Sequence, residues 1–171
     1  VRRHALGRFD QLLPAAVLHP AVLLYLDGAT STKTHPNENL GRELLELYTV
    51  GVGSYSEDDV KASARILTGY GLDMWATWVP VYRPERHATG RVDVLGFGHP
   101  NAEADGRAVA EAYLRHLAHH PATAARLARK LVAAFVSDES HPRLERELAR
   151  VYLANATAVV PVLRALIRSP E

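Results

Sequence analysis

The chain has 171 residues, of which 20 are Lys or Arg and 19 are Asp or Glu, so its formal net charge is +1. This even balance excludes the broad basic surface of a nucleic-acid-binding protein, and no apolar run reaches the roughly 18 residues of a membrane-spanning helix. The absence of Cys excludes disulfides, thiolate metal sites and Cys nucleophiles. Because the length is that of one domain, we expect a single domain over residues 1–171.

Helical spacing begins near the start of the chain. Apolar side chains recur at three- and four-residue intervals over residues 8–18, which predicts a helix. The His-Pro pair at 19–20 ends it, because the residue before a Pro avoids the α region. A short helix is predicted over residues 21–26, and residues 29–36 are polar without periodicity, which predicts a loop.

A longer helix is predicted over residues 37–50. Asn37 is a typical N-cap, and Leu side chains recur at i, i+4 and i+7 from Leu40. Gly41 lies inside this helix, where Gly costs about 1 kcal/mol relative to Ala. It is either a tolerated weak point or the place where another backbone approaches closely.

The remaining elements follow the same pattern with one interruption. Ser56 and Asp59 form a predicted capping box for a helix that ends at Gly69. Residues 71–101 lack a helical period, and two segments within them read as short strands. These are residues 79–82 and 92–95, and further helices are predicted over residues 102–119, 121–136, 142–154 and 157–167. The predicted fold is therefore mostly α, a multi-helix domain with one irregular insertion (about residues 71–101) that holds a short β-hairpin.

The helix over residues 37–50 carries the most unusual polar pattern. Glu38, Arg42 and Glu46 share one face at i, i+4 and i+8. This face is a solvated one with weak ion pairs, each contributing about 0.2–0.5 kcal/mol, or a structural network that ties the helix to its neighbours. In a third interpretation, Glu43 and Glu46 are paired carboxylates held by Arg42 that bind a cation or move a proton. We expect the charged face to pack against the 71–101 insertion.

Other candidate groups are weaker. His116 and His120 have a spacing that can place two imidazoles on one metal ion, but they lack the intervening Glu of a zinc protease and lie near a helix end that favours positive charge. Trp75 and Trp78 are expected in the local core of the insertion, with a carbohydrate platform as the alternative. His87 is expected in a loop.

Three segments of the sequence resemble a bacterial family, domain of unknown function 1800. They run from His19 to Asp27 (HPAVLLYLD), from Asn37 to Val52 (NENLGRELLELYTVGV) and from Arg65 to Tyr70 (RILTGY). The similarity continues around Arg86-His87 and to the end of the chain, although Ala88 stands where the family usually has Asp. Nearly the whole chain is covered, and it corresponds to the C-terminal portion of a longer protein.

The resemblance implies a helical domain of an exported or envelope-associated bacterial protein, and it assigns no activity, cofactor or metal. The matching motifs add residues to the candidate site without giving them roles. Candidates for catalysis are Glu43, Glu46, Arg42 and His87, and candidates for binding or a polar network are Asn37, Glu38, Asn39 and Arg65.

Two functions are open on this basis. We favour a binding or structural module whose partner is the missing N-terminal part of the same protein or another exported protein, with no nucleic acid and no membrane span. The alternative is a metal- or carboxylate-assisted hydrolase acting at the cell envelope, in which Glu43 or Glu46 is a base or ligand, Arg42 holds charge, and His87 is a ligand or proton shuttle. The hydrolase predicts that Glu43 and His87 converge in a cleft.

Overall fold

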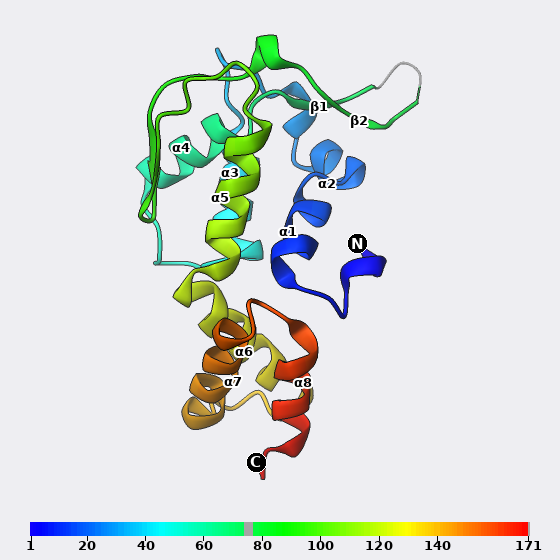
Figure 1. Cartoon of the computed structure of the whole chain (residues 1–171), viewed down its shortest axis with the longest axis vertical. Helices are drawn as coiled ribbons and strands as arrows, with labels where there is room; N and C mark the ends of the chain where they lie inside the picture. The colour runs from blue at the N-terminus through cyan, green and yellow to red at the C-terminus, as the bar shows by residue number, and fades with distance from the viewer. Residues whose placement is uncertain (74–76, 171) are drawn as a thin grey trace.

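The computed structural model describes residues 1–73 and 77–170, and it is mostly helical (Figure 1). Its helices are α1 (Phe9–Val17), α2 (Pro20–Tyr25), α3 (Glu38–Glu43), α4 (Glu57–Ile66), α5 (Arg107–His119), α6 (Pro121–Phe135), α7 (Pro142–Ala154) and α8 (Val159–Arg168). Short 3-10 turns are η1 (Arg2–His4), η2 (Gly28–Thr30) and η4 (Pro84–Arg86). The predicted fold class is thus confirmed. Over the described ranges, no helix combines the length and apolarity needed to cross a membrane.

The helix predicted over residues 37–50 changes character part of the way along. Asn37 caps α3 as predicted, because its side chain accepts hydrogen bonds from the N–H groups of Asn39 and Leu40. After Glu43 the chain continues as a π-helical turn, η3 (Leu44–Tyr48). Such turns occur often at functional sites in helices, and this one contains Glu46.

Gly41 is the point at which α3 and α4 meet. A Cβ atom at this position would lie 2.9 Å from the carbonyl oxygen of Val60 and 3.0 Å from the nitrogen of Ala64. Of the two interpretations of Gly41, the structure therefore supports close backbone approach. The capping box of Ser56 and Asp59 is present at the start of α4.

The insertion holds two antiparallel hairpins in the part of the chain that the structure describes, where one was predicted. Strand β1 (Tyr70–Leu72) pairs with β2 (Pro80–Tyr82), and β3 (Val92–Val94) pairs with β4 (Phe97–His99). The two predicted strands appear as β2 and β3. Their partners β1 and β4 each have a Gly at the centre, Gly71 and Gly98, which weakens the strand signal in the sequence. Trp75 lies outside the described residues, and Trp78 is largely exposed, not part of the core.

Two helices begin later than predicted. Helix α5 begins at Arg107 and not at residue 102, because the preceding loop is held elsewhere: the hydroxyl of Tyr82 accepts a hydrogen bond from the N–H of Gly106 at 2.6 Å. Helix α8 begins at Val159, since Thr157 has a left-handed backbone (φ 66°) and its hydroxyl accepts the N–H of Asp10 at 3.2 Å. Thr157 therefore connects to α1 and does not cap α8.

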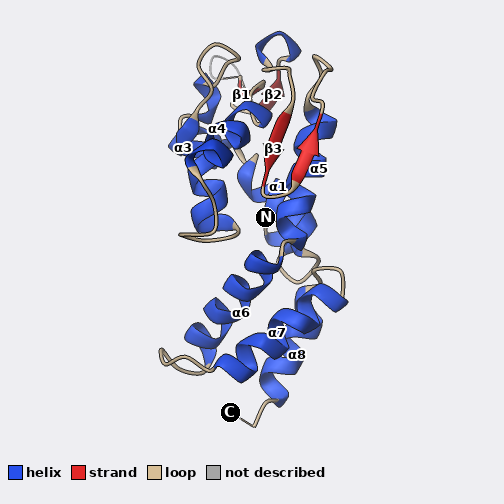
Figure 2. Ribbon diagram, turned by 90° about the vertical axis from the view of Figure 1, so that its left-hand side faces the viewer, coloured by secondary structure: helices blue, strands red, loops and turns tan. Residues whose placement is uncertain are grey.

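The apolar core consists of two clusters. The larger one lies among α1 to α5 and the hairpins, and the smaller one lies among α6, α7 and α8, which pack side by side in Figure 2. Phe9 packs against both clusters. Beside it, the N–H of Phe9 donates to the carbonyl of Thr157, and the N–H of Val159 donates to the carbonyl of Gly7, both at 2.9 Å. This short bridge connects the two parts of the fold.

Candidate functional site

The polar residues of α3 and η3 contact the connection that leads to α4. Arg42 forms a two-pronged ion pair with Glu57, with both N–O distances at 2.7 Å. Tyr55 donates a hydrogen bond from its hydroxyl to Glu46 at 2.6 Å, and this bond raises the pKa of the Tyr55 hydroxyl. The contacts go to residues 55–57 and not to the 71–101 insertion, so the expectation about the charged face is wrong. They fit the structural-network interpretation.

Glu43 lies apart from these contacts. Its Oε2 atom is buried and has no hydrogen-bond partner among the described residues. Burial, and then the charge of Glu43, raise the pKa of the neighbouring Tyr48 hydroxyl. Glu38 and Asn39 are exposed on the first turn of α3. Asn37 does more than cap the helix, since its side-chain nitrogen donates to the carbonyl of Leu26 at 2.6 Å.

His87 lies in a loop, as predicted, but its side chain is buried and only 3% exposed. Its Nε2 atom lies 2.9 Å from Oδ1 of Asn101, and its Nδ1 atom lies 3.1 Å from the carbonyl oxygen of Thr68. A Cβ atom on Gly106 would collide with the imidazole ring, so the loop before α5 closes directly over it. Sequence reasoning missed Asn101, which has a left-handed backbone (φ 47°) and donates its amide to the carbonyl of Ala88.

Arg65 holds the segment that directly follows His87, residues 89–91. Its guanidinium donates to the carbonyls of Thr89 at 2.8 Å and Arg91 at 3.2 Å. The structure therefore places Arg65 against the segment that follows His87, while His87 itself packs under the loop before α5. It does not join Glu43 with His87: within residues 1–73 and 77–170, no hydrogen bond or ion pair connects the two.

The His116 and His120 pair has other partners as well. The Nε2 atom of His116 lies 3.0 Å from the carbonyl oxygen of Leu95, and Nδ1 of His120 accepts the N–H of Ala122 at 3.2 Å. Burial, and then the charge of His116, lower the pKa of His120. Among the residues with described positions, no group of three or more His, Cys, Asp or Glu side chains could hold a metal ion.

A polar groove of about 670 Å³ lies between α1 and α5, within the volume range of ligand sites. The α1 side supplies Arg8, Asp10, Gln11, Pro14 and Leu18; the α5 side supplies Arg107, Glu111, Leu114 and Arg115; Tyr70 closes one end. Sequence reasoning missed this groove. The signal was available on one side, since the charged residues of α5 recur at i, i+4 and i+8 like those of the helix over residues 37–50.

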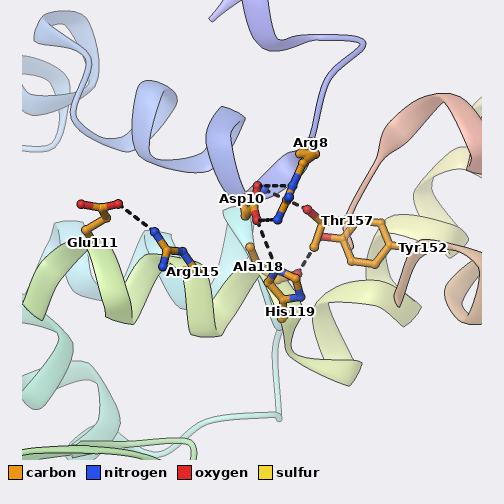
Figure 3. A network of polar contacts seen from close by, with 8 residues as sticks. All are labelled: Arg8, Asp10, Glu111, Arg115, Ala118, His119, Tyr152 and Thr157. Atoms are coloured by element: carbon orange, nitrogen blue, oxygen red, sulfur yellow. Dashed lines mark hydrogen bonds and ion pairs between the residues drawn. The ribbon is translucent and has the colours of Figure 1, made fainter. Parts of the chain in front are cut away.

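The charged groups of the groove are arranged in pairs. Figure 3 shows Asp10 between Arg8 and His119, and Glu111 beside Arg115, which donates to it at 2.8 Å. Arg107 pairs with Asp105 at 2.6 Å and lies 5.5 Å from the ring centre of Tyr82. Burial raises the pKa of the Tyr70 hydroxyl to about 12, so this hydroxyl carries no charge at neutral pH.

The exposure of these groups determines what a ligand meets. The side chains of Arg8, Arg107 and Arg115 are 47%, 63% and 60% exposed, whereas that of Asp10 is 5% exposed. Glu111 is the exposed carboxylate that lines the groove. A ligand therefore meets a row of positive, negative and positive charge along α5, with a further guanidinium opposite.

Asp10 lines the groove and also contacts Thr157 at the bridge between the two apolar clusters. A substitution of Asp10 should therefore change the stability of the protein. Burial raises the pKa of its carboxyl, but the hydrogen bonds from Arg8 and His119 outweigh burial and hold this pKa below its ordinary value. The ionised Asp10 carboxylate therefore contributes to the free energy of unfolding at pH values above its unfolded-state pKa of about 3.9. This contribution is lost as the pH falls through the lower pKa that the group has in the folded state.

We expect Asp10→Asn to lower the free energy of unfolding by about 2 kcal/mol at pH 7, because charge-assisted hydrogen bonds are lost. The difference from the parent protein shrinks in urea titrations below about pH 4. The control is Asp93→Asn, which breaks an exposed pair with Arg91 and changes stability by less than about 1 kcal/mol. Equal effects of the two variants at pH 7 contradict the role of Asp10.

Comparisons with known proteins agree with the resemblance seen in the sequence. Neither a search of curated proteins nor a search of solved structures finds a match. A family model described as protein of unknown function (DUF1800) matches residues 1–171, which is the whole chain. That match covers the segments that form α2, α3 and α4 and the loop around His87. The chain therefore belongs to the DUF1800 family.

Proposed function

We propose that the chain is a binding module whose α1–α5 groove receives an extended segment of a partner polypeptide. The observation that carries the proposal is the exposed row of Arg107, Glu111 and Arg115, which faces the α1 wall across an open groove. The partner is the N-terminal part of the same protein or another exported protein. The chain then acts as part of an exported or envelope-associated protein, a location that rests on the family and that cell fractionation of the full-length protein tests.

The spacing of the charges supports an extended partner. Residues four apart in an α-helix are displaced by about 6 Å along its axis. Side chains on one face of an extended chain repeat every two residues, at about 6.6 Å. A segment with acidic, basic and acidic side chains at alternate positions can therefore face Arg107, Glu111 and Arg115 together. Because these side chains are exposed, each pair adds only about 0.2–1 kcal/mol, and the affinity depends on salt.

The hydrolase is not supported by a comparable observation. It requires Glu43 and His87 in one cleft, but the described contacts of His87 are with Thr68 and Asn101. Arg42 is engaged by Glu57 and Glu46 by Tyr55. Arg42, Glu46 and His87 thus hold segments of the fold, and Glu43 has no hydrogen bond to any of them among the described residues. We propose no reaction for these four residues.

The test uses a fluorescein-labelled peptide with Asp, Lys and Asp at alternate positions and Val between them. We expect saturable binding by fluorescence anisotropy at low salt, and weaker binding of the charge-inverted peptide with Lys, Asp and Lys. The double variant Arg107→Gln, Arg115→Gln loses about tenfold in affinity, because two exposed charge pairs together contribute about 1.4 kcal/mol.

The matched control is Arg91→Gln, which removes an exposed Arg that also pairs with a nearby Asp but lies directly before β3, outside the groove lining. Its affinity for the peptide should equal that of the parent protein. Equal binding of both peptides, or an unchanged affinity of the double variant, overturns the proposal.

A further inference from the structure

A second, apolar cleft separates α1 from α6 on the side away from the polar groove. One cavity of about 260 Å³ lies among α1, η3 and α6, and another of about 190 Å³ lies among α1, α6, α7 and α8. Phe9, Leu12 and Leu127 line both cavities, so the two are neighbours along one apolar strip.

The walls of this strip are aliphatic and aromatic. Ala16 and Leu47 line the first cavity, and Leu131 and Val162 line the second. The hydroxyl of Tyr152, which also lines the second cavity, is occupied because it donates to the carbonyl of Ala118 at 2.6 Å. A narrow apolar strip of this kind suits a single flexible hydrocarbon chain, whose burial contributes about 0.8 kcal/mol per CH₂ group.

Two cations lie at the mouth of the first cavity. Lys130 lines it, and Arg126 is one turn earlier on α6 and donates to the carbonyl of Leu47, another lining residue, at 3.3 Å. Neither side chain forms an ion pair among the described residues. Burial, and then the charge of Arg126, lower the pKa of Lys130, because the two positive charges lie one turn apart on α6 and repel each other.

An anionic group between these two side chains relieves that repulsion. Glu43 does not serve this purpose in the structure, since the ion pairs of the described residues do not join it to either cation and its Oε2 atom is buried. We propose that the cleft between α1 and α6 binds a free fatty acid, with the hydrocarbon chain along Phe9, Leu12 and Leu127 and the carboxylate between Lys130 and Arg126. This site is independent of the polar groove.

Isothermal titration calorimetry with dodecanoate tests the proposal on the whole chain. We expect saturable binding of dodecanoate, no detectable binding of butyrate at the same concentration, and at least about tenfold weaker binding of dodecyltrimethylammonium, which has the same chain length and the opposite charge. Equal affinity for the anionic and cationic amphiphiles overturns the proposal. Binding to anionic phospholipid vesicles without binding of monomeric dodecanoate also overturns it, in favour of a membrane surface.

Two variants separate the head-group site from the hydrocarbon site. Lys130→Gln lowers the affinity for dodecanoate about tenfold, because the ion pair between Lys130 and the carboxylate is lost. The affinity for neutral dodecanol stays unchanged. Ala16→Phe fills the first cavity and weakens both ligands. The control is Lys61→Gln, because Lys61 is an exposed Lys on α4 beside Asp58. This variant should bind dodecanoate with the affinity of the parent protein. If Lys130→Gln and Lys61→Gln bind dodecanoate equally, the carboxylate site is wrong.

Discussion

His87→Ala is expected to lower the free energy of unfolding by about 3 kcal/mol. The substitution removes a buried ring, leaves a cavity under Gly106, and deprives Oδ1 of Asn101 of its hydrogen-bond donor. Deleting a large buried side chain costs about 3–5 kcal/mol, and an unsatisfied buried polar group adds to the loss. Urea denaturation followed by circular dichroism measures the difference.

The control for this prediction is His35→Ala. His35 is exposed in the loop before α3, where its Nδ1 atom contacts the hydroxyl of Thr34. Exposed substitutions of this kind change stability by less than about 0.5 kcal/mol. A His87→Ala protein as stable as His35→Ala would show that His87 does not hold the loop before α5, and would return it to the set of residues free to act in catalysis.

Gly41→Ala is expected to lower the free energy of unfolding by about 2 kcal/mol. On an exposed helix the same change adds about 1 kcal/mol of stability, because Ala has the higher helix propensity. Here the new methyl group meets the backbone of Val60 and Ala64, which cannot move without shifting α4 away from α3. Overpacking of a tight contact costs about 1–3 kcal/mol, so the sign of the effect distinguishes close approach from a tolerated weak point.

Gly98→Ala is the matched control for Gly41→Ala. The nearest atom that its Cβ would meet is a carboxylate oxygen of Asp93, on an exposed side chain that can rotate away. Its stability should therefore stay within about 0.5 kcal/mol of the parent protein in thermal unfolding. A stabilised Gly41→Ala variant would mean that α3 and α4 are not in backbone contact.

The sequence predicts those features that depend on neighbouring residues. The cap at Asn37 and the capping box of Ser56 and Asp59 were both readable, because each is specified within one helical turn. The helix order was readable for the same reason, from apolar periodicity. The two interpretations of Gly41 stayed open, because the backbone that it meets belongs to Val60 and Ala64 on another helix. The position of β2 was also evident, but not that of β1, which is recognisable only through pairing.

The site was harder to predict because its contacts join distant positions. His87 and Asn101 are 14 residues apart, and Arg42 and Glu57 are 15 apart, so no local pattern couples them. Ala88 beside His87 offers no side-chain partner in the sequence, and the structure supplies the side-chain amide of Asn101 instead. The polar groove combines α1, Tyr70 and α5, which periodicity within one helix cannot bring together.

The bridge between Gly7–Phe9 and Thr157–Val159 has a consequence for the order of folding. Helices α6, α7 and α8 follow one another along the chain and can associate through short loops, so their cluster forms from local contacts. The bridge closes a loop of about 150 residues, which is slow because the entropy of loop closure is lost before the contacts form. During synthesis the segment around Phe9 leaves the ribosome before α8, so the contacts of Phe9 with the smaller cluster form only after α8 has been made.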